Sequence, residues 1–142
     1  MRYPGASVPE APSTTVQDAL PIGYSISKWI AEQWTYQASL LGLTTRTFIV
    51  GYISGSTETG SWNKTDMIPR VLEASVEQKI IPEEFGDFTW IPVNVCAQVI
   101  SGVSLYGNPG IFHVVNPETL PWKVLVNNIR YESREFSQVE NI

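Results

Sequence analysis

Residues 23–34 read GYSISKWIAEQW, and this stretch decides how the fold of the chain is interpreted. From it, apolar and amide side chains recur at intervals of three and four residues as far as Leu41, and Gly42 follows. That spacing places the apolar side chains on one face of a helix, and glycine is common just beyond a helix C-terminus. The pattern therefore predicts a helix over residues 24–41.

Two polar side chains of this helix, Tyr24 and Lys28, have the spacing Y-x-x-x-K. Residues at i and i+4 lie on one face of a helix, and an ammonium group one turn from a phenol favours the phenolate form. A tyrosine in that setting can act as a general acid or base, and it suits protonation of the alkoxide formed when a hydride reaches a carbonyl. The same spacing also occurs in ordinary surface pairs, so the rest of the chain has to decide between the two.

Strand-like and helix-like patterns alternate along the remainder of the sequence. β-Branched and aromatic runs predict strands over residues 44–53, 88–93 and 111–115. Helices are expected over residues 66–79, 94–105 and 117–130, with Asp66 or Thr65 as the N-cap of the first and Asn94 as that of the second. The alternation predicts an α/β fold with at least one parallel crossover connection.

Length and composition limit the classes of protein that the chain can represent. A proline-rich arm over residues 1–21 is expected to precede one domain over residues 22–142. The net charge is -5 with nine Lys and Arg, so no basic stripe for nucleic acid is present. A single cysteine and a single histidine do not make a zinc site. The sequence has neither an apolar window of about 18 residues nor a signal peptide, so a cytoplasmic location is expected.

Four segments together resemble one known family. They are GYSISKWIAEQW, then VGYISGSTETGSWN at residues 50–63, FTWIPVNVCAQVI at residues 88–100 and FHVVNPETLPW at residues 112–122. In this order and spacing they resemble thioester reductase domains, which are extended short-chain dehydrogenases. Such domains end many nonribosomal peptide synthetases and carboxylic acid or aminoadipate reductases. The resemblance extends over residues 22–129.

The resemblance implies roles for the residues that match the family's motifs. The tyrosine matching Tyr24 is the proton donor, and the lysine matching Lys28 tunes it and orients the nicotinamide ribose. The backbone at Gly51, Tyr52 and Ile53 would lie beside the nicotinamide of NADPH, provided that the nucleotide-binding half is supplied. No metal is implied.

The resemblance also implies a fold and a substrate. The expected fold is partial and Rossmann-like, the substrate-binding half of an extended short-chain dehydrogenase, with few strands and about four helices. Trp62, Asn63 and Trp90 would help to form the substrate side. Family members reduce a carrier-bound thioester to an aldehyde with NADPH. The implied substrate is therefore a small molecule or a carrier-bound acyl or peptidyl group.

One signature of the family is missing from the 142 residues. No glycine-rich turn between a first strand and a first helix is present to hold a dinucleotide pyrophosphate. NADPH binding by this chain alone is therefore not expected. An exposed sheet edge would invite a homo-oligomer or a complex with a complementary half.

Three functions remain open at this point. The first is a truncated thioester-reductase-like protein of natural-product biosynthesis. The second is a repurposed, cofactor-independent enzyme that uses the retained pocket as a cyclase, isomerase, dehydratase or hydrolase. The third is a non-catalytic interaction module for a carrier protein or a synthase, in which replacing Tyr24 by phenylalanine would leave the function intact.

Overall fold

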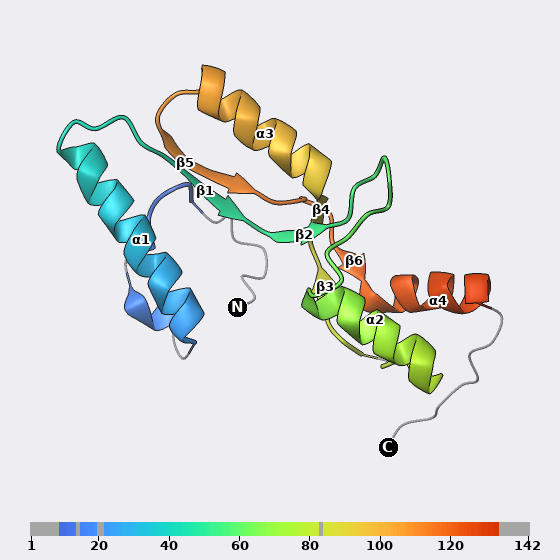
Figure 1. Cartoon of the computed structure of the whole chain (residues 1–142). Coiled ribbons are helices and arrows are strands. Elements are labelled where there is room, and N and C mark those ends of the chain that lie inside the picture. The colour runs from blue at the N-terminus through green and yellow to red at the C-terminus, as the bar shows by residue number, and fades with distance from the viewer. Residues whose placement is uncertain (1–8, 14, 20–21, 83, 134–142) are drawn as a thin grey trace. The chain divides into compact units, whose positions relative to one another are not determined.

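The computed structural model describes residues 9–13, 15–19, 22–82 and 84–133 (Figure 1). Its helices are α1 (Gly23–Leu40), α2 (Met67–Gln78), α3 (Val93–Tyr106) and α4 (Trp122–Ser133), together with the 3-10 turn η1 (Val16–Asp18). Its strands are β1 (Arg46–Val50), β2 (Tyr52–Ser54), β3 (Asp87–Phe88), β4 (Trp90–Pro92), β5 (Gly110–Val114) and β6 (Leu120–Pro121). The predicted arm over residues 1–21 lies in part outside the described residues.

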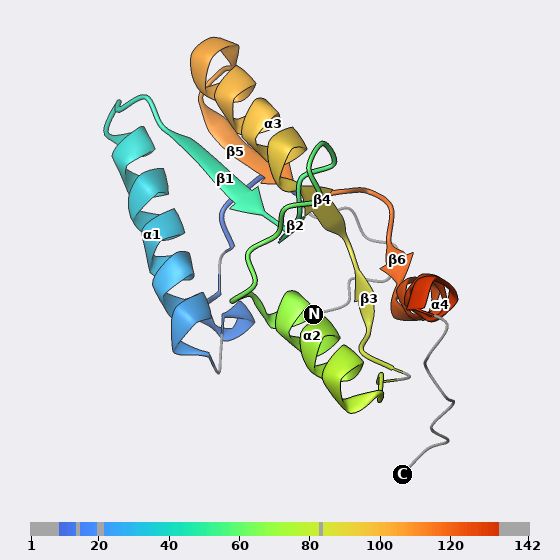
Figure 2. The same ribbon diagram turned by 45° about the vertical axis from the view of Figure 1, so that its right-hand side comes forward.

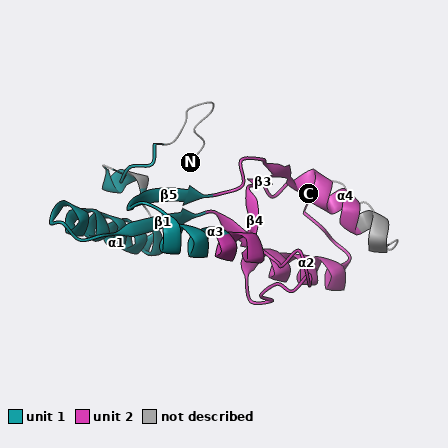
Figure 3. Cartoon of the chain, turned by 90° about the horizontal axis from the view of Figure 1, so that it is seen from above, with its two compact units in different colours: residues 1–50, 99–114 teal, residues 51–98, 115–142 magenta. Residues whose placement is uncertain are grey.

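The chain divides into two compact units, coloured separately in Figure 3. Unit 1 comprises residues 1–50 and 99–114, and unit 2 comprises residues 51–98 and 115–142. Each unit contains one parallel strand pair, β1 with β5 in unit 1 and β2 with β4 in unit 2. The predicted α/β class with parallel connections is therefore confirmed.

In unit 1, β1 and β5 pair in parallel with Phe48 opposite Phe112. The two rings stack with their centroids 5.7 Å apart. At the start of β1, the Arg46 guanidinium donates hydrogen bonds of 2.6 and 3.2 Å to the carbonyl of Gly107. These contacts fix the register of the pair.

The single strand predicted over residues 44–53 is interrupted at Gly51, and this expectation is corrected. The segment before Gly51 pairs with β5, and the segment after it pairs with β4. A Cβ atom at Gly51 would lie 3.1 Å from Val115 Cγ1, tighter than ordinary van der Waals contact. The position therefore favours glycine, because the backbone must pass close to Val115 where the strand changes its partner.

The buried core described by the structure lies in unit 2. Its buried members are Ile68, Ile81, Phe88, Trp122 and Val126. The Trp122 indole N–H donates a 2.6 Å hydrogen bond to the Pro82 carbonyl, and its ring lies 5.1 Å from that of Phe85. In Figure 2, α4 is seen beside β6, which pairs antiparallel with β3. Trp122 thus joins the start of α4 to the loop that leads into β3.

Two predicted helix starts are wrong. The last helix was expected from residue 117 but begins at Trp122. A turn, in which Asn116 accepts a hydrogen bond from the Glu118 backbone N–H, and then strand β6 occupy the residues before it. The third helix begins at Val93, so Asn94 lies in its first turn and is not its N-cap. The Asn94 side chain instead bonds to Thr57, a contact that no local pattern could indicate.

The other helix predictions are confirmed to within a residue or two. Helix α1 ends where expected, with Gly42 in the left-handed region at φ +89°. Asp66 is the N-cap of α2, and Pro69 lies in the first turn, where its missing N–H has no partner to lose. Among the described residues, no helix is both long and apolar enough to cross a membrane.

Candidate functional site

Helix α1 brings Tyr24 and Lys28 together, as their spacing predicts. The Lys28 Nζ atom lies 5.2 Å from the centroid of the Tyr24 ring, which is within cation–π range. Tyr24 is 70% exposed, and within the described residues its hydroxyl has no hydrogen-bond partner. A carbonyl oxygen could therefore reach the phenol from solvent with the ammonium group close by.

The face of α1 next to this pair holds the backbone of Ser13. Glu32 Oε1 accepts a 2.9 Å hydrogen bond from the Ser13 N–H. The Ser13 carbonyl accepts from Trp29 Nε1 at 3.2 Å and from Gln33 Nε2 at 2.8 Å. Glu32 is thus hydrogen-bonded to Ser13, and among the described residues it forms no ion pair with Lys28. The N–H donors of the Lys28 ammonium are therefore available to other acceptors.

The three positions expected beside the nicotinamide lie in unit 2, whereas Tyr24 and Lys28 belong to unit 1. Tyr52 and Ile53 form the start of β2, in register with Trp90 and Ile91 of β4. Both side chains are exposed, and the Tyr52 ring makes an edge contact with Phe88 at 5.4 Å. Gly51 precedes them, and Val115 packs closely against its backbone.

Two of the three residues expected on the substrate side lie together. The rings of Trp62 and Trp90 meet edge to face, with centroids 5.4 Å apart at 82°. Both indole Nε1 atoms are buried without a partner in the described part of the chain. Asn63 is used locally: its amide donates to Asp66 Oδ1 at 2.9 Å, and its oxygen accepts from the Thr65 N–H at 3.1 Å. Asn63 therefore shapes the turn that leads into α2.

The loop that carries Trp62 is fixed at its base and at its tip. Asn94 Oδ1 accepts from the Thr57 N–H at 3.1 Å, and Asn94 Nδ2 donates to Thr57 Oγ1 at 2.9 Å. The Ser56 N–H donates to the Ser61 carbonyl, and Gly60 adopts φ +66°, which favours glycine. The side-chain amide of Asn94, in the first turn of α3, therefore holds the loop in place.

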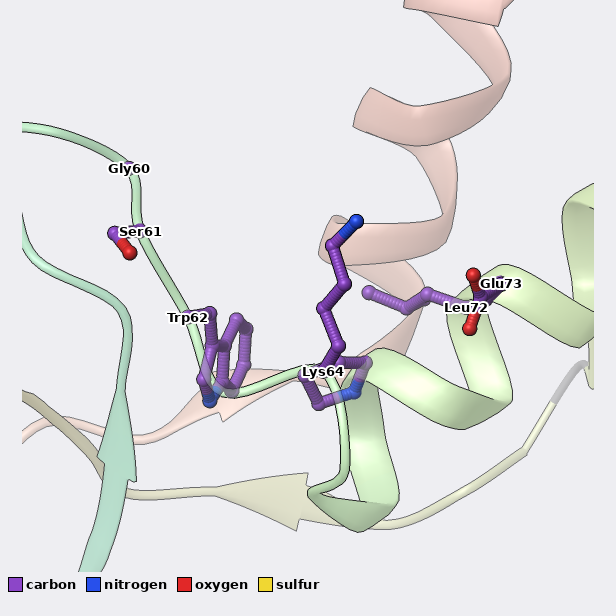
Figure 4. A pocket seen from close by; sticks show the side chains of 7 residues that line it. Gly60, Ser61, Trp62, Lys64, Leu72 and Glu73 are labelled. Carbon is purple, nitrogen blue, oxygen red and sulfur yellow. The ribbon is translucent and has the colours of Figure 1, made fainter.

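A cavity of about 380 Å³ opens beside this loop (Figure 4). It is lined by Gly60, Ser61, Trp62, Lys64, Pro69, Leu72 and Glu73. The sequence indicated Trp62 but missed the contribution of α2. The sequence shows that Pro69, Leu72 and Glu73 are spaced to share one face of a helix, but it does not indicate which loop lies against that face. Among the described residues, no group of three His, Cys, Asp or Glu side chains could hold a metal ion.

Comparison with known proteins adds a family to this geometry. Residues 6–100, more than half of the chain, match the family model described as "NAD_binding_4: Male sterility protein". The chain belongs to this family. The matched residues include Tyr24, Lys28, Trp62 and Trp90, so the tyrosine–lysine helix and the tryptophan loop both lie in family sequence. A nucleotide cofactor is therefore implied for the family.

Individual relatives agree with this assignment. The chain is 36% identical to the isonitrile lipopeptide synthase of Streptomyces coeruleorubidus over 80% of its own length and 8% of that protein. It is 30% identical to the adenylate-forming reductase stbB of Stachybotrys bisbyi, over 87% of its length and 12% of that protein. The crystal structure of the terminal R domain from the myxalamid PKS-NRPS biosynthetic pathway superimposes with a TM-score of 0.74 at 29% identity. That match covers 80% of this chain and 29% of the solved chain.

These matches confirm the resemblance to terminal reductase domains of nonribosomal peptide and polyketide pathways. They also confirm the fold as part of an extended short-chain dehydrogenase. The chain spans 8% and 12% of the two curated relatives, so it corresponds to a small part of each.

Proposed function

We propose that this chain supplies the tyrosine–lysine pair and the substrate side of an NADPH-dependent thioester reductase of natural-product biosynthesis. The observation that carries the proposal is the contact of 5.2 Å between the Lys28 ammonium and the Tyr24 ring, within sequence that matches an NAD-binding family. We propose residues 22–142 as the reductase-like domain, residues 1–21 as its arm and the cytoplasm as its location.

The exposed groups suit the chemistry of carbonyl reduction. Tyr24 can deliver its phenolic proton to a carbonyl oxygen, and the Lys28 ammonium lies beside its ring. Lys28 has no ion pair among the described residues, so its donors suit the hydroxyl groups of a ribose. The nicotinamide cofactor, when bound, supplies the hydride. The exposed start of β2, at Tyr52 and Ile53, would be open to its ring.

Binding of the rest of the cofactor requires residues outside these 142. A pyrophosphate needs a glycine-rich turn at a helix N-terminus, and the sequence has none. We therefore propose that this chain works with a complementary nucleotide-binding half. A carrier-bound acyl or peptidyl thioester is the proposed substrate.

We expect the chain alone to bind NADPH with a Kd above about 1 mM, and an assembly with a nucleotide-binding half to bind it in the micromolar range. That half can be taken from the part of the related terminal R domain that this chain does not cover, and it would be co-expressed. Binding would be followed by NADPH fluorescence.

Two lysine variants provide a matched comparison in the same assembly. Lys28→Met should weaken NADPH binding by about tenfold or more, because it removes hydrogen bonds from a charged donor. Lys123→Met, on α4, should leave it unchanged. Micromolar binding by the chain alone, or equal effects of the two variants, would contradict the proposed division of roles.

We further propose that the chain associates through unit 1. Large apolar side chains are exposed on α1, where Leu41 beyond its C-terminus is 85% exposed, and at the end of α3, where Tyr106 is 88% exposed. No described residue of α1 is buried, and all five positions of β1 are half-buried. Surfaces of this kind favour association. Sedimentation of the isolated chain should show a dimer or larger species, which a complementary half should dissociate; a monomer at all concentrations would refute this.

A further inference from the structure

The cavity between the Trp62 loop and the first two turns of α2 has an apolar wall. Its apolar surface comes from Trp62, Pro69 and Leu72. Trp62 and Leu72 are labelled in Figure 4. Its volume of about 380 Å³ lies at the lower end of the range for pockets that hold small molecules. A small apolar group therefore matches the cavity in both size and surface.

The wall rests on groups that are already fixed. Trp62 makes an edge-to-face contact with Trp90, and its buried Nε1 atom has no hydrogen-bond partner among the described residues, so the ring contact holds the indole. Leu72 and Trp62 both pack against the core cluster that contains Ile68. A ligand would find a preformed surface, and binding would need little ordering of side chains.

The charged members of the lining have opposite signs. Lys64 and Glu73 are both exposed, and neither has an ion pair in the described part of the chain. In Figure 4 the Lys64 side chain is drawn between Trp62 and Leu72, with Glu73 beyond Leu72. A ligand with a net charge would be attracted by one of them and repelled by the other. Burial of apolar surface is then the main source of affinity.

We propose that this cavity binds the neutral, apolar acyl group of the thioester substrate. The proposal rests on the proposed function in that the ligand is identified as an acyl thioester. It names the class of acyl group, an uncharged hydrocarbon or aryl chain, and assigns Leu72 and Pro69 of α2 to the site beside Trp62.

Neutral thioesters of increasing chain length test the site on the full chain without NADPH. Butanoyl, hexanoyl and octanoyl thioesters of N-acetylcysteamine would be titrated by calorimetry. We expect the Kd to fall by about fourfold per added methylene until the cavity is filled, with a negative heat-capacity change. N-acetylcysteamine alone should not bind. A Kd independent of chain length would overturn the proposal.

Variants then locate the binding. Leu72→Ala, which removes part of the wall, and Ser61→Phe, which fills the cavity from an exposed position, should each raise the Kd of the octanoyl probe at least about tenfold. Val76→Ala is the matched control, because Val76 lies on α2, is 57% exposed and does not line the cavity. It should change nothing, and an effect equal to that of Leu72→Ala would place the ligand elsewhere. Thermal melting identifies any variant that fails to fold, and Ser61→Phe leaves the core intact.

Charge variants test the neutrality of the ligand. Lys64→Met and Glu73→Gln should each change the Kd by less than about threefold, because they keep the side-chain length and remove only the charge. A larger loss in either variant would mean that the ligand is held by charge, which refutes the proposal.

The site and the reductase function can fail independently. If the thioester series binds as expected but the assembly with a nucleotide-binding half does not reduce it, the reductase function fails and the acyl site stands. If the assembly reduces all chain lengths equally well with and without Leu72→Ala, the acyl site fails and the reductase function stands.

Discussion

Replacing Tyr24 by phenylalanine should lower kcat for thioester reduction about 100-fold to 10,000-fold in the assembly with a nucleotide-binding half. The phenol of the Tyr24–Lys28 contact is the proposed proton donor, and phenylalanine keeps the ring while removing the hydroxyl. KM for the thioester should change by less than about threefold, because the substitution leaves the shape of the helix face intact. Absorbance of NADPH during turnover provides the measurement.

The same helix offers a matched control for this experiment. Tyr36 also lies on α1, and its hydroxyl makes no hydrogen bond in the part of the chain that the structure describes. Tyr36→Phe removes the same atom and should retain full activity. If Tyr24→Phe keeps more than about a tenth of the wild-type kcat, Tyr24 is not the proton donor, and a non-catalytic interaction module becomes the better interpretation.

Replacing Trp122 by alanine should lower the free energy of unfolding of unit 2 by about 3–5 kcal/mol. Trp122 is 3% exposed and lies in the core cluster with Phe88 and Val126. The truncation leaves a cavity among aromatic rings and also removes the donor for the Pro82 carbonyl. A loss of this size is a large fraction of the stability of a small protein.

Urea unfolding followed by circular dichroism would measure this loss. Trp122→Phe separates its two sources, because it keeps most of the packing and loses the hydrogen bond, at a cost of about 1–3 kcal/mol. Val124→Ala, at an exposed position on the same helix, should stay within about 0.5 kcal/mol of the wild type. A loss below about 1.5 kcal/mol for Trp122→Ala would mean that the core of unit 2 does not depend on this ring.

The sequence predicted the helices best where their signals were local. Helix α1 has its apolar spacing, its terminal glycine and its Tyr24–Lys28 pair within one continuous stretch. Helix α2 has its cap and its proline within a few residues of each other. Such features depend on the geometry of neighbouring residues and not on which distant segments meet.

The errors arose where a distant partner decides the local structure. The run over residues 44–53 reads as one strand, yet it pairs with β5 before Gly51 and with β4 after it. The last helix was expected from residue 117, but pairing with β3 makes Leu120 and Pro121 a strand. Asparagine is a favoured residue type at helix N-caps, but the Asn94 amide bonds to Thr57 instead.

The candidate site likewise has one part that follows from neighbouring residues and another that depends on distant ones. By itself the sequence determined that Tyr24 and Lys28 share one helix face, because residues four apart on a helix must do so. Only the tertiary structure decided that Trp62 packs on Trp90 and that Leu72 of α2 completes an apolar cavity beside it. Those contacts join segments that are separated along the chain, and their meeting depends on how the strands of unit 2 pair and how its core packs.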